Sequence, residues 1–197
     1  KRKSMLSYKE SLKILKETDA LLEGHFILSS GLHSEKYIQC AQLLSKPKKA
    51  KFICESLAEK IRKNFEKIDL LLSPAVGGII IGHEIGKILN IEAIFAERVN
   101  EIFSLRRGFK INKGQKILIL EDVITTGKSS LECSNLVSKA GGEIVGYACL
   151  IDRSAGTTNI DKKIISQVEI KIPTYSEENL PKHLKGIKAI KPGSRNL

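Results

Sequence analysis

What this 197-residue chain lacks excludes several classes of protein. Its four cysteines, Cys40, Cys54, Cys133 and Cys149, include no close pair and have no metal-ligand spacing. That pattern argues against a disulfide framework and against a zinc site. No apolar run approaches the roughly 18 residues that a membrane helix needs, and no signal-peptide core follows the basic first residues. We therefore expect a cytoplasmic protein with no membrane partner.

The chain also lacks internal repeats, low-complexity segments and any linker long enough to divide it, so we expect one structural domain overall. Its net charge of +11 favours polyanionic partners, either nucleic acid or small phosphorylated substrates. The lysines are scattered along the sequence, and no basic stripe is interleaved with aromatic residues as in many nucleic-acid-binding surfaces. We therefore expect small phosphorylated substrates and no nucleic acid.

The most informative stretch runs from Lys116 to Ser130. An apolar run typical of a parallel strand buried on both faces ends in the acidic pair Glu121 and Asp122. A hydroxyl- and glycine-rich turn follows, and a helical pattern begins at about Ser129. Such a turn lies at the carboxyl edge of an α/β sheet, where ligands bind, and its backbone N–H groups favour an anion. The two acids would repel that anion, so sugar hydroxyls or a divalent cation carried by the ligand would suit them.

Three interpretations of this motif compete. Gly127-Lys128-Ser129 matches the end of a Walker A loop, but that loop needs a glycine where Asp122 stands. An ordinary strand-to-helix turn is disfavoured, because an acidic pair is costly at a buried strand end without a ligand. Two acids, two hydrophobic residues, Thr-Thr-Gly and then small hydroxyl residues instead resemble the ribose-phosphate signature of the type I phosphoribosyltransferases.

Helical and strand patterns alternate along the rest of the chain, which is typical of a doubly wound α/β fold. We expect helices over residues 8–23, 48–64, 79–89 and 129–140, and strands over residues 69–73, 91–96, 144–151 and 164–172. The buried face of the second helix is expected to comprise Phe52, Ile53, Leu57 and Ile61. Residues 25–40 indicate two short strands joined at Gly31, either a cover over a site or a surface hairpin. Residues 177–184 form at most a short helix, and residues 188–197 an ordered loop or docked tail.

Three further segments carry residues suited to anions. The glycine-rich turn from Pro74 to Gly78 would let backbone amides approach a phosphate, or would simply allow tight packing. The basic loop over residues 97–110 is either a mobile lid that clamps phosphates or a solvated loop. Arg153 follows a buried strand and suits a carboxylate or a planar heterocycle, or else a surface pair with Asp152.

Several segments in matching order resemble the orotate phosphoribosyltransferase family. They correspond to the family's hood over the base, its diphosphate loop and motifs of one bacterial branch. Besides the central motif, they are Phe26 to Tyr37, Ser73-Pro-Ala-Val-Gly-Gly78, Phe95-Ala-Glu-Arg98, Leu105-Arg-Arg-Gly-Phe109 and Lys191-Pro-Gly-Ser-Arg195. The resemblance extends from about residue 20 to the end and is more specific than the central motif alone.

This resemblance implies an α/β fold with a doubly wound, mostly parallel sheet, a Rossmann-like core and a small N-terminal hood. It divides the chain into an N-terminal helix and hood segment, residues 1–45, and a phosphoribosyltransferase core with a C-terminal tail, residues 46–197. The implied reaction transfers the phosphoribosyl group from 5-phosphoribosyl 1-diphosphate to orotate, giving orotidine 5′-monophosphate and diphosphate in pyrimidine (UMP) biosynthesis. A glycosyltransferase (pentosyltransferase) of this family would use Mg²⁺ and act as a homodimer.

The resemblance also implies roles for individual residues. Phosphoribosyl diphosphate would be bound by Glu121, Asp122, Val123, Ile124, Thr125, Thr126, Gly127, Lys128 and Ser129. The diphosphate loop would comprise Ala75, Val76, Gly77 and Gly78. Orotate would be bound by Thr125, Arg153, Ser29 and Tyr37. Mg²⁺ would be held mainly through the substrate diphosphate, with no dedicated protein ligands.

The sequence departs from the family pattern in two places. Many relatives have a lysine in the diphosphate loop where this chain has Gly77, and a catalytic lysine and histidine in a mobile loop supplied across a dimer. Residues 97–110 contain no histidine, and no lysine before Lys110. The catalytic group would therefore comprise Glu121 and Asp122, with Arg98, Arg106 and Arg107 as substitutes for the missing cations.

Two other functions stay open on sequence alone. A phosphoribosyltransferase for a purine or another base is the nearest alternative, and Arg153 weighs against it because a carboxylated base gives this arginine a partner. The other is a regulator of the same fold that binds nucleic acid and has lost catalysis. The intact acidic pair weighs against the regulator.

Overall fold

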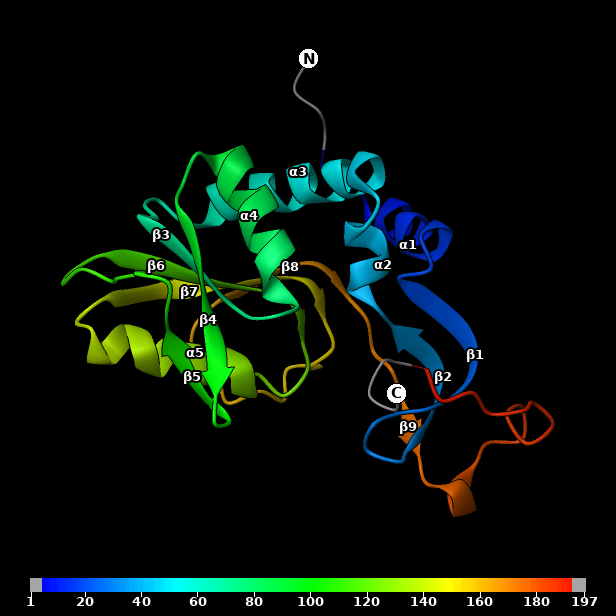
Figure 1. The fold of residues 1–197 in the computed structure, drawn as a ribbon. Helices are drawn as coiled ribbons and strands as arrows, with labels where there is room; N and C mark the ends of the chain where they lie inside the picture. Colours follow the sequence, from blue (N-terminus) through cyan, green and yellow to red (C-terminus); the bar gives the residue numbers. More distant parts are fainter. Residues whose placement is uncertain (1–4, 193–197) are drawn as a thin grey trace.

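The computed structural model describes residues 5–192, which form two β-sheets with helices around the larger one (Figure 1). The helices are α1 (Tyr8–Glu17), α2 (Cys40–Leu44), α3 (Pro47–Asn64), α4 (Gly78–Leu89), α5 (Lys128–Lys139) and the short 3-10 helix η1 (Glu177–Asn179). The larger sheet contains β3 (Leu70–Pro74), β4 (Ala93–Val99), β5 (Ile102–Leu105), β6 (Lys116–Ile124), β7 (Glu143–Asp152) and β8 (Ile164–Glu169). The smaller sheet contains β1 (Leu21–Ile27), β2 (His33–Ile38) and β9 (Thr174–Tyr175).

The larger sheet has the strand order β5-β4-β3-β6-β7-β8, and its neighbours are parallel except for β4 and β5. From β3 the chain moves outward to β4 and then returns to β6 on the other side of β3. The topological switch point therefore lies between the neighbouring strands β3 and β6. Doubly wound sheets bind ligands at the carboxyl edge of this point. The expected α/β fold with a doubly wound, mostly parallel sheet is confirmed.

Two apolar clusters cover the two faces of this sheet. On one face, α1, α3 and α4 pack against strand residues that include Leu118. On the other face, Cys133 and Val137 of α5 pack against strand residues that include Ile119. Because successive residues of a strand face opposite sides, Leu118 and Ile119 fall in different clusters. Burial on both faces explains the continuous apolar run of β6.

The smaller sheet, here called the hood, is built from both ends of the chain. β1 and β2 form the expected hairpin, whose turn contains Gly31 at φ +82°. β9 adds to β2 from the C-terminal side. Ile190 adds a bridge to β1, because its N–H donates to His25 O and its carbonyl accepts from Ile27 N–H, both over 2.8 Å. The tail is thus docked on the hood through Ile190, and residues 193–197 lie outside the described part.

The first helix is shorter than predicted. α1 ends at residue 17 and not at residue 23, because Asp19 takes the left-handed conformation with φ +60°. The N–H groups of Asp19 and Ala20 donate to carbonyls of the last helical turn, which is a Schellman motif. Leu21 and Leu22 continue the apolar spacing of the helix, but they belong to β1.

Two further predictions were wrong. Residues 97–110 were expected to form a loop, but β4 extends to residue 99 and β5 returns beside it as an antiparallel edge strand with Phe103 buried. Phe52 was expected on the buried face of α3 and is 44% exposed. The buried positions 53, 57 and 61 are four residues apart, and Phe52 is rotated about 100° away from that stripe.

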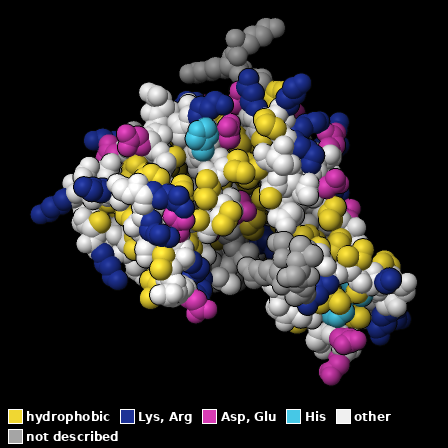
Figure 2. Space-filling view, in the orientation of Figure 1, with side chains coloured by type: hydrophobic (Ala, Val, Ile, Leu, Met, Phe, Trp, Pro, Cys, Tyr) yellow, Lys and Arg dark blue, Asp and Glu magenta, His cyan; other side chains and the backbone are white. Residues whose placement is uncertain are grey.

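None of the helices in residues 5–192 is long and apolar enough to cross a membrane. Figure 2 shows lysine and arginine side chains spread over the visible face, not gathered in one patch, with apolar side chains along its middle. This distribution agrees with the scattered lysines of the sequence.

Candidate active site

The predicted binding residues of the core lie at the carboxyl ends of β3, β6 and β7. β6 runs through both acids of the central motif and ends at Ile124. β3 leads into the predicted diphosphate loop, residues 75–78, and β7 ends at Asp152 just before Arg153. Because these strands are parallel neighbours, their ends meet at the switch point of the sheet.

Glu121 is 8% exposed and enclosed by its neighbours. Cys149 of β7 lies opposite it in register, and Ser130 of α5 donates a hydrogen bond from its Oγ to Glu121 Oε2. Burial raises the pKa of Glu121 to about 7, the bond from Ser130 acts in the opposite direction, and the charge of Asp122 adds to the increase. The carboxyl group of Glu121 is therefore held in place and changes charge near neutral pH.

Asp122 faces the diphosphate loop. A Cβ placed on Gly77 would lie 2.8 Å from each carboxylate oxygen of Asp122. Burial raises the pKa of Asp122, and the N–H of Val123 donates to its Oδ1 over 2.9 Å. Any side chain at position 77, including the lysine of many relatives, would displace this carboxylate. The glycine is what allows the acid and the loop to meet.

The turn from Thr125 to Ser129 presents backbone N–H groups at the N-terminus of α5. Gly127 precedes the helix with φ +79°, a conformation that glycine adopts freely, and as the cap residue it has no side chain to accept a first-turn N–H. Only the N–H of Lys128 is met by a neighbouring hydroxyl, Thr126 Oγ1, over 3.3 Å among the described residues. The first-turn N–H groups and the helix dipole favour an anion here. The β7–β8 connection supports the turn from behind, since a Cβ on Gly127 would lie 2.9 Å from Ile160 Cδ1.

Arg153 is held beside this turn, where its backbone N–H donates to Ile124 O over 2.8 Å. Its side-chain Nε is buried and has no hydrogen-bond partner within residues 5–192, and burial lowers the pKa of the guanidinium. The alternative surface pair of Arg153 with Asp152 is not present among the described residues, and Asp152 Oδ1 accepts from the Ser154 N–H over 2.8 Å. The Arg153 side chain is half-buried, and a buried guanidinium N–H without an acceptor is costly, so this site favours a carboxylate ligand.

Two other predicted orotate residues, Ser29 and Tyr37, lie in the hood. Ser29 is exposed in the hairpin turn. Tyr37 is half-buried, with its ring centroid 5.8 Å from that of Phe26. Cys40, the first residue of α2 after the hood strand β2, lies with its Sγ 4.0 Å from the carbonyl oxygen of Asp122. Contact of Ser29 and Tyr37 with orotate stays a prediction.

The three candidate arginines differ in their contacts. Arg98 is held by Glu132 of α5, with 2.6 Å between Nη2 and Oε2. Arg107 donates to both carboxylate oxygens of Glu97, over 2.7 and 2.8 Å. The side chain of Arg106 is exposed and makes no ion pair or hydrogen bond within the described residues, and its charge acts on Glu97 only at a distance. β4 and β3 separate the β5 end that carries Arg106 from the acids of β6.

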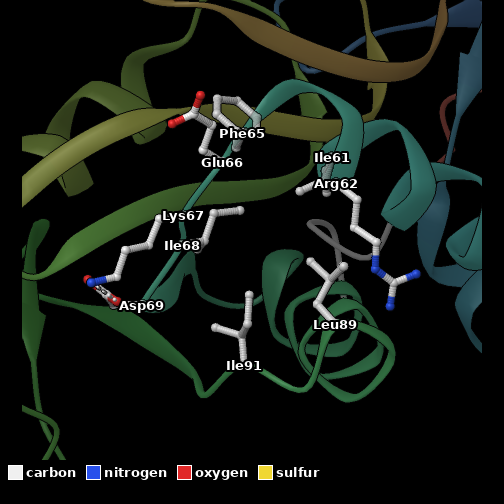
Figure 3. A pocket seen from close by; sticks show the side chains of 9 residues that line it. All are labelled: Ile61, Arg62, Phe65, Glu66, Lys67, Ile68, Asp69, Leu89 and Ile91. Carbon is white, nitrogen blue, oxygen red and sulfur yellow. Dashed lines mark ion pairs between the residues drawn. The ribbon is translucent and has the colours of Figure 1, made fainter.

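A pocket of about 320 Å³ opens at the opposite edge of the sheet, between the ends of α3 and α4 (Figure 3). It is lined by Ile61, Arg62, Phe65, Glu66, Lys67, Ile68, Asp69, Leu89 and Ile91. None of the predicted site residues is among them. The pocket adjoins the amino ends of β3 and β4, so it is separate from the candidate active site.

Comparisons with known proteins agree with this geometry. The family model of the phosphoribosyl transferase domain matches residues 41–184. An orotate phosphoribosyltransferase of Sphingopyxis alaskensis is 52% identical over 182 residues, which are 91% of this chain and 92% of the relative. That of Rhizorhabdus wittichii is 48% identical over 178 residues, 90% and 91% of the two chains. The crystal structure of orotate phosphoribosyltransferase from Aeropyrum pernix has a TM-score of 0.68 at 23% identity and covers 80% of this chain and 92% of that one.

The fold and the matched residues define a phosphoribosyltransferase, and the chain belongs to that family. The high identity over nearly the full length of both relatives assigns the chain to a narrower group. Within the family, the chain belongs to the orotate phosphoribosyltransferases. The resemblance seen in the sequence is confirmed.

Three residues that surround the site were given no site role from the sequence: Ser130, Ile160 and Cys40. Ser130 ends the stretch singled out in the sequence and directly follows the last predicted binding residue, so its hydroxyl was an available signal. Ile160 and Cys40 gave none, because only the folded chain brings them to Gly127 and Asp122.

Proposed function

We propose that this chain transfers the phosphoribosyl group from 5-phosphoribosyl 1-diphosphate to orotate at the carboxyl edge of its larger sheet. The observation that carries the proposal is the buried, unpaired Nε of Arg153 beside the turn that favours an anion. The carboxylate of orotate gives this guanidinium its missing partner. Thr125 at the start of the turn, with Ser29 and Tyr37 of the hood, completes the base site.

Each of the remaining predicted site segments binds another part of phosphoribosyl diphosphate. The turn over residues 125–129 holds the 5′-phosphate, Glu121 and Asp122 face the ribose hydroxyls, and the loop over residues 75–78 meets the diphosphate. As diphosphate leaves C1′ and the orotate nitrogen approaches, positive charge develops on the ribose. The acids stabilise that charge, while positioning and exclusion of water supply much of the rate.

Mg²⁺ would bind to the protein together with the substrate diphosphate. Within residues 5–192, no three His, Cys, Asp or Glu side chains gather into a group able to hold a metal ion. Mg²⁺ bound chiefly through diphosphate oxygens would neutralise charge on that leaving group. The four buried free cysteines suit a reducing compartment, and we place the enzyme in the cytoplasm.

The proposal is tested by following the ultraviolet absorbance of orotate in the presence of phosphoribosyl diphosphate and Mg²⁺. We expect orotate to be consumed, and adenine, hypoxanthine and uracil to be left unchanged under the same conditions. Consumption of another base in place of orotate would reassign the base site. Binding of phosphoribosyl diphosphate without consumption of any base would support a regulator that has lost catalysis.

Arg106 is the arginine that we propose to clamp the diphosphate, because Arg98 and Arg107 are already held by carboxylates. Replacing Arg106 with alanine should lower kcat by roughly 10- to 100-fold, in line with the loss of one charge-assisted contact in the transition state. The thermal midpoint should stay within about 1 °C, since an exposed side chain without partners is removed. Arg98→Ala, which breaks the contact to Glu132, should lower the midpoint, and it serves as the comparison.

Arg106 lies away from the acids of its own chain, so we propose that it serves a partner subunit in a homodimer. Mixing the impaired variants Arg106→Ala and Arg153→Ala tests this directly. Random heterodimers would contain one site with both arginines intact, which restores roughly a quarter of the wild-type activity if the loop acts across subunits. No recovery on mixing, or a monomer in sedimentation at high concentration, would refute action across subunits.

A further inference from the structure

Ser130 stands outside the substrate-binding segment, yet it touches the acid at the centre of the site. It is the third residue of α5 and is fully buried. Its hydroxyl donates to Glu121 Oε2. A buried serine on a helix usually bonds back to a carbonyl of its own helix, so a bond to a neighbouring strand indicates a different role.

We propose that Ser130 is a positioning residue for the transfer step: it fixes the Glu121 carboxylate beneath the ribose and favours its ionised form. The inference rests on the proposed function, because it assigns Glu121 to the sugar. Ser130 lies in the first turn of the helix whose N-terminus faces the 5′-phosphate. One hydrogen bond therefore joins the ribose subsite to the phosphate subsite, so that both ends of the ribose phosphate are held by one rigid unit.

Of the groups that act on the pKa of Glu121, the Ser130 hydroxyl is the one that favours the ionised carboxylate. The titratable groups that face Glu121 are Asp122 on the same strand, Cys133 on α5 and Cys149 on β7. β3, the other neighbouring strand, carries none. Burial and the charge of Asp122 both raise the pKa of Glu121, and the bond from Ser130 lowers it. Removing the hydroxyl should therefore raise that pKa further.

The test compares pH profiles of kcat/KM for phosphoribosyl diphosphate. Ser130→Ala should move the acidic limb upward by about one pH unit, the size expected for losing a hydrogen bond to a charged group. At pH 9, where Glu121 is ionised in both proteins, the variant should recover to within about threefold of wild type. Ser130→Thr keeps the hydroxyl and should leave the limb in place. Ser138→Ala, an exposed serine on the same helix, is the matched control.

A double variant separates positioning from packing. Glu121→Gln removes the titrating group, so adding Ser130→Ala to it should cause little further loss of kcat. An unmoved limb in Ser130→Ala, or an equal loss at every pH together with a lower thermal midpoint, would overturn the proposal. The carboxyl signal of Glu121, followed by NMR against pH in the free protein, gives the same comparison without activity. It therefore distinguishes a wrong role for Ser130 from a wrong assignment of the reaction.

Discussion

Glu121→Gln is expected to make the protein more stable while lowering kcat by roughly 100-fold or more. The pKa of Glu121 rises from 4.5 to about 7 on folding because the carboxyl group is buried. A raised folded pKa means that this group's contribution to stability is fully present below pH 4.5 and is lost as pH rises through 7. Glutamine carries no charge and avoids this loss. The increase in the free energy of unfolding should grow from about 1 kcal/mol at pH 5 to about 3 kcal/mol at pH 8.5.

Urea unfolding at a series of pH values measures this difference directly. Glu66→Gln, at an exposed position on the opposite edge of the sheet, should shift the unfolding free energy by less than about 0.5 kcal/mol at every pH. If Glu121→Gln were less stable than wild type at pH 8.5, the carboxyl group would be stabilising in the free protein. The interpretation that burial of the Glu121 carboxylate lowers the stability of the free protein, and is kept because the substrate needs that carboxylate, would then be wrong.

The second large effect concerns the base. Arg153→Ala should lower kcat/KM for orotate by roughly 100- to 1,000-fold, because it removes a desolvated cation from a buried carboxylate contact. Binding of phosphoribosyl diphosphate should change little, since the turn over residues 125–129 meets its 5′-phosphate. Arg153→Lys should recover only a small part of the loss, because an ammonium group cannot form the two parallel bonds of a guanidinium.

Calorimetry of orotate binding in the presence of diphosphate, with thermal unfolding alongside, checks this result. The thermal midpoint of Arg153→Ala should not fall, because Nε has no partner to lose in the free protein. Arg62→Ala, an arginine beside the pocket at the other edge of the sheet, should leave orotate binding unchanged. Wild-type affinity for orotate in Arg153→Ala would place the base elsewhere.

The sequence predicted the parts of the site that are continuous along the chain. Residues 121–129 form one strand end, one turn and one helix start, so a buried run followed by acids and a glycine sufficed to find them. Arg153 was found for the same reason, because it directly follows a buried strand. The short hood strands were visible from the turn at Gly31.

Other features depend on contacts between distant segments. The end of α1 is decided by the left-handed backbone at Asp19, while the apolar spacing continues into Leu21 and Leu22. Residues 97–110 were predicted to form a basic loop, because the local sequence contains no pattern that indicates the burial of Phe103. The pairing of Arg107 with Glu97, which leaves Arg106 exposed, also required coordinates.

The composition of the hood affects the order in which the two sheets can be completed during synthesis. β1 and β2 leave the ribosome before the strands of the larger sheet, whereas β9 and Ile190 leave it after them. During synthesis the β1–β2 hairpin therefore keeps open edges while the strands of the larger sheet are still being added. The hood is complete only after Ile190 has emerged, so the strands of the larger sheet are all available for pairing before the hood is finished.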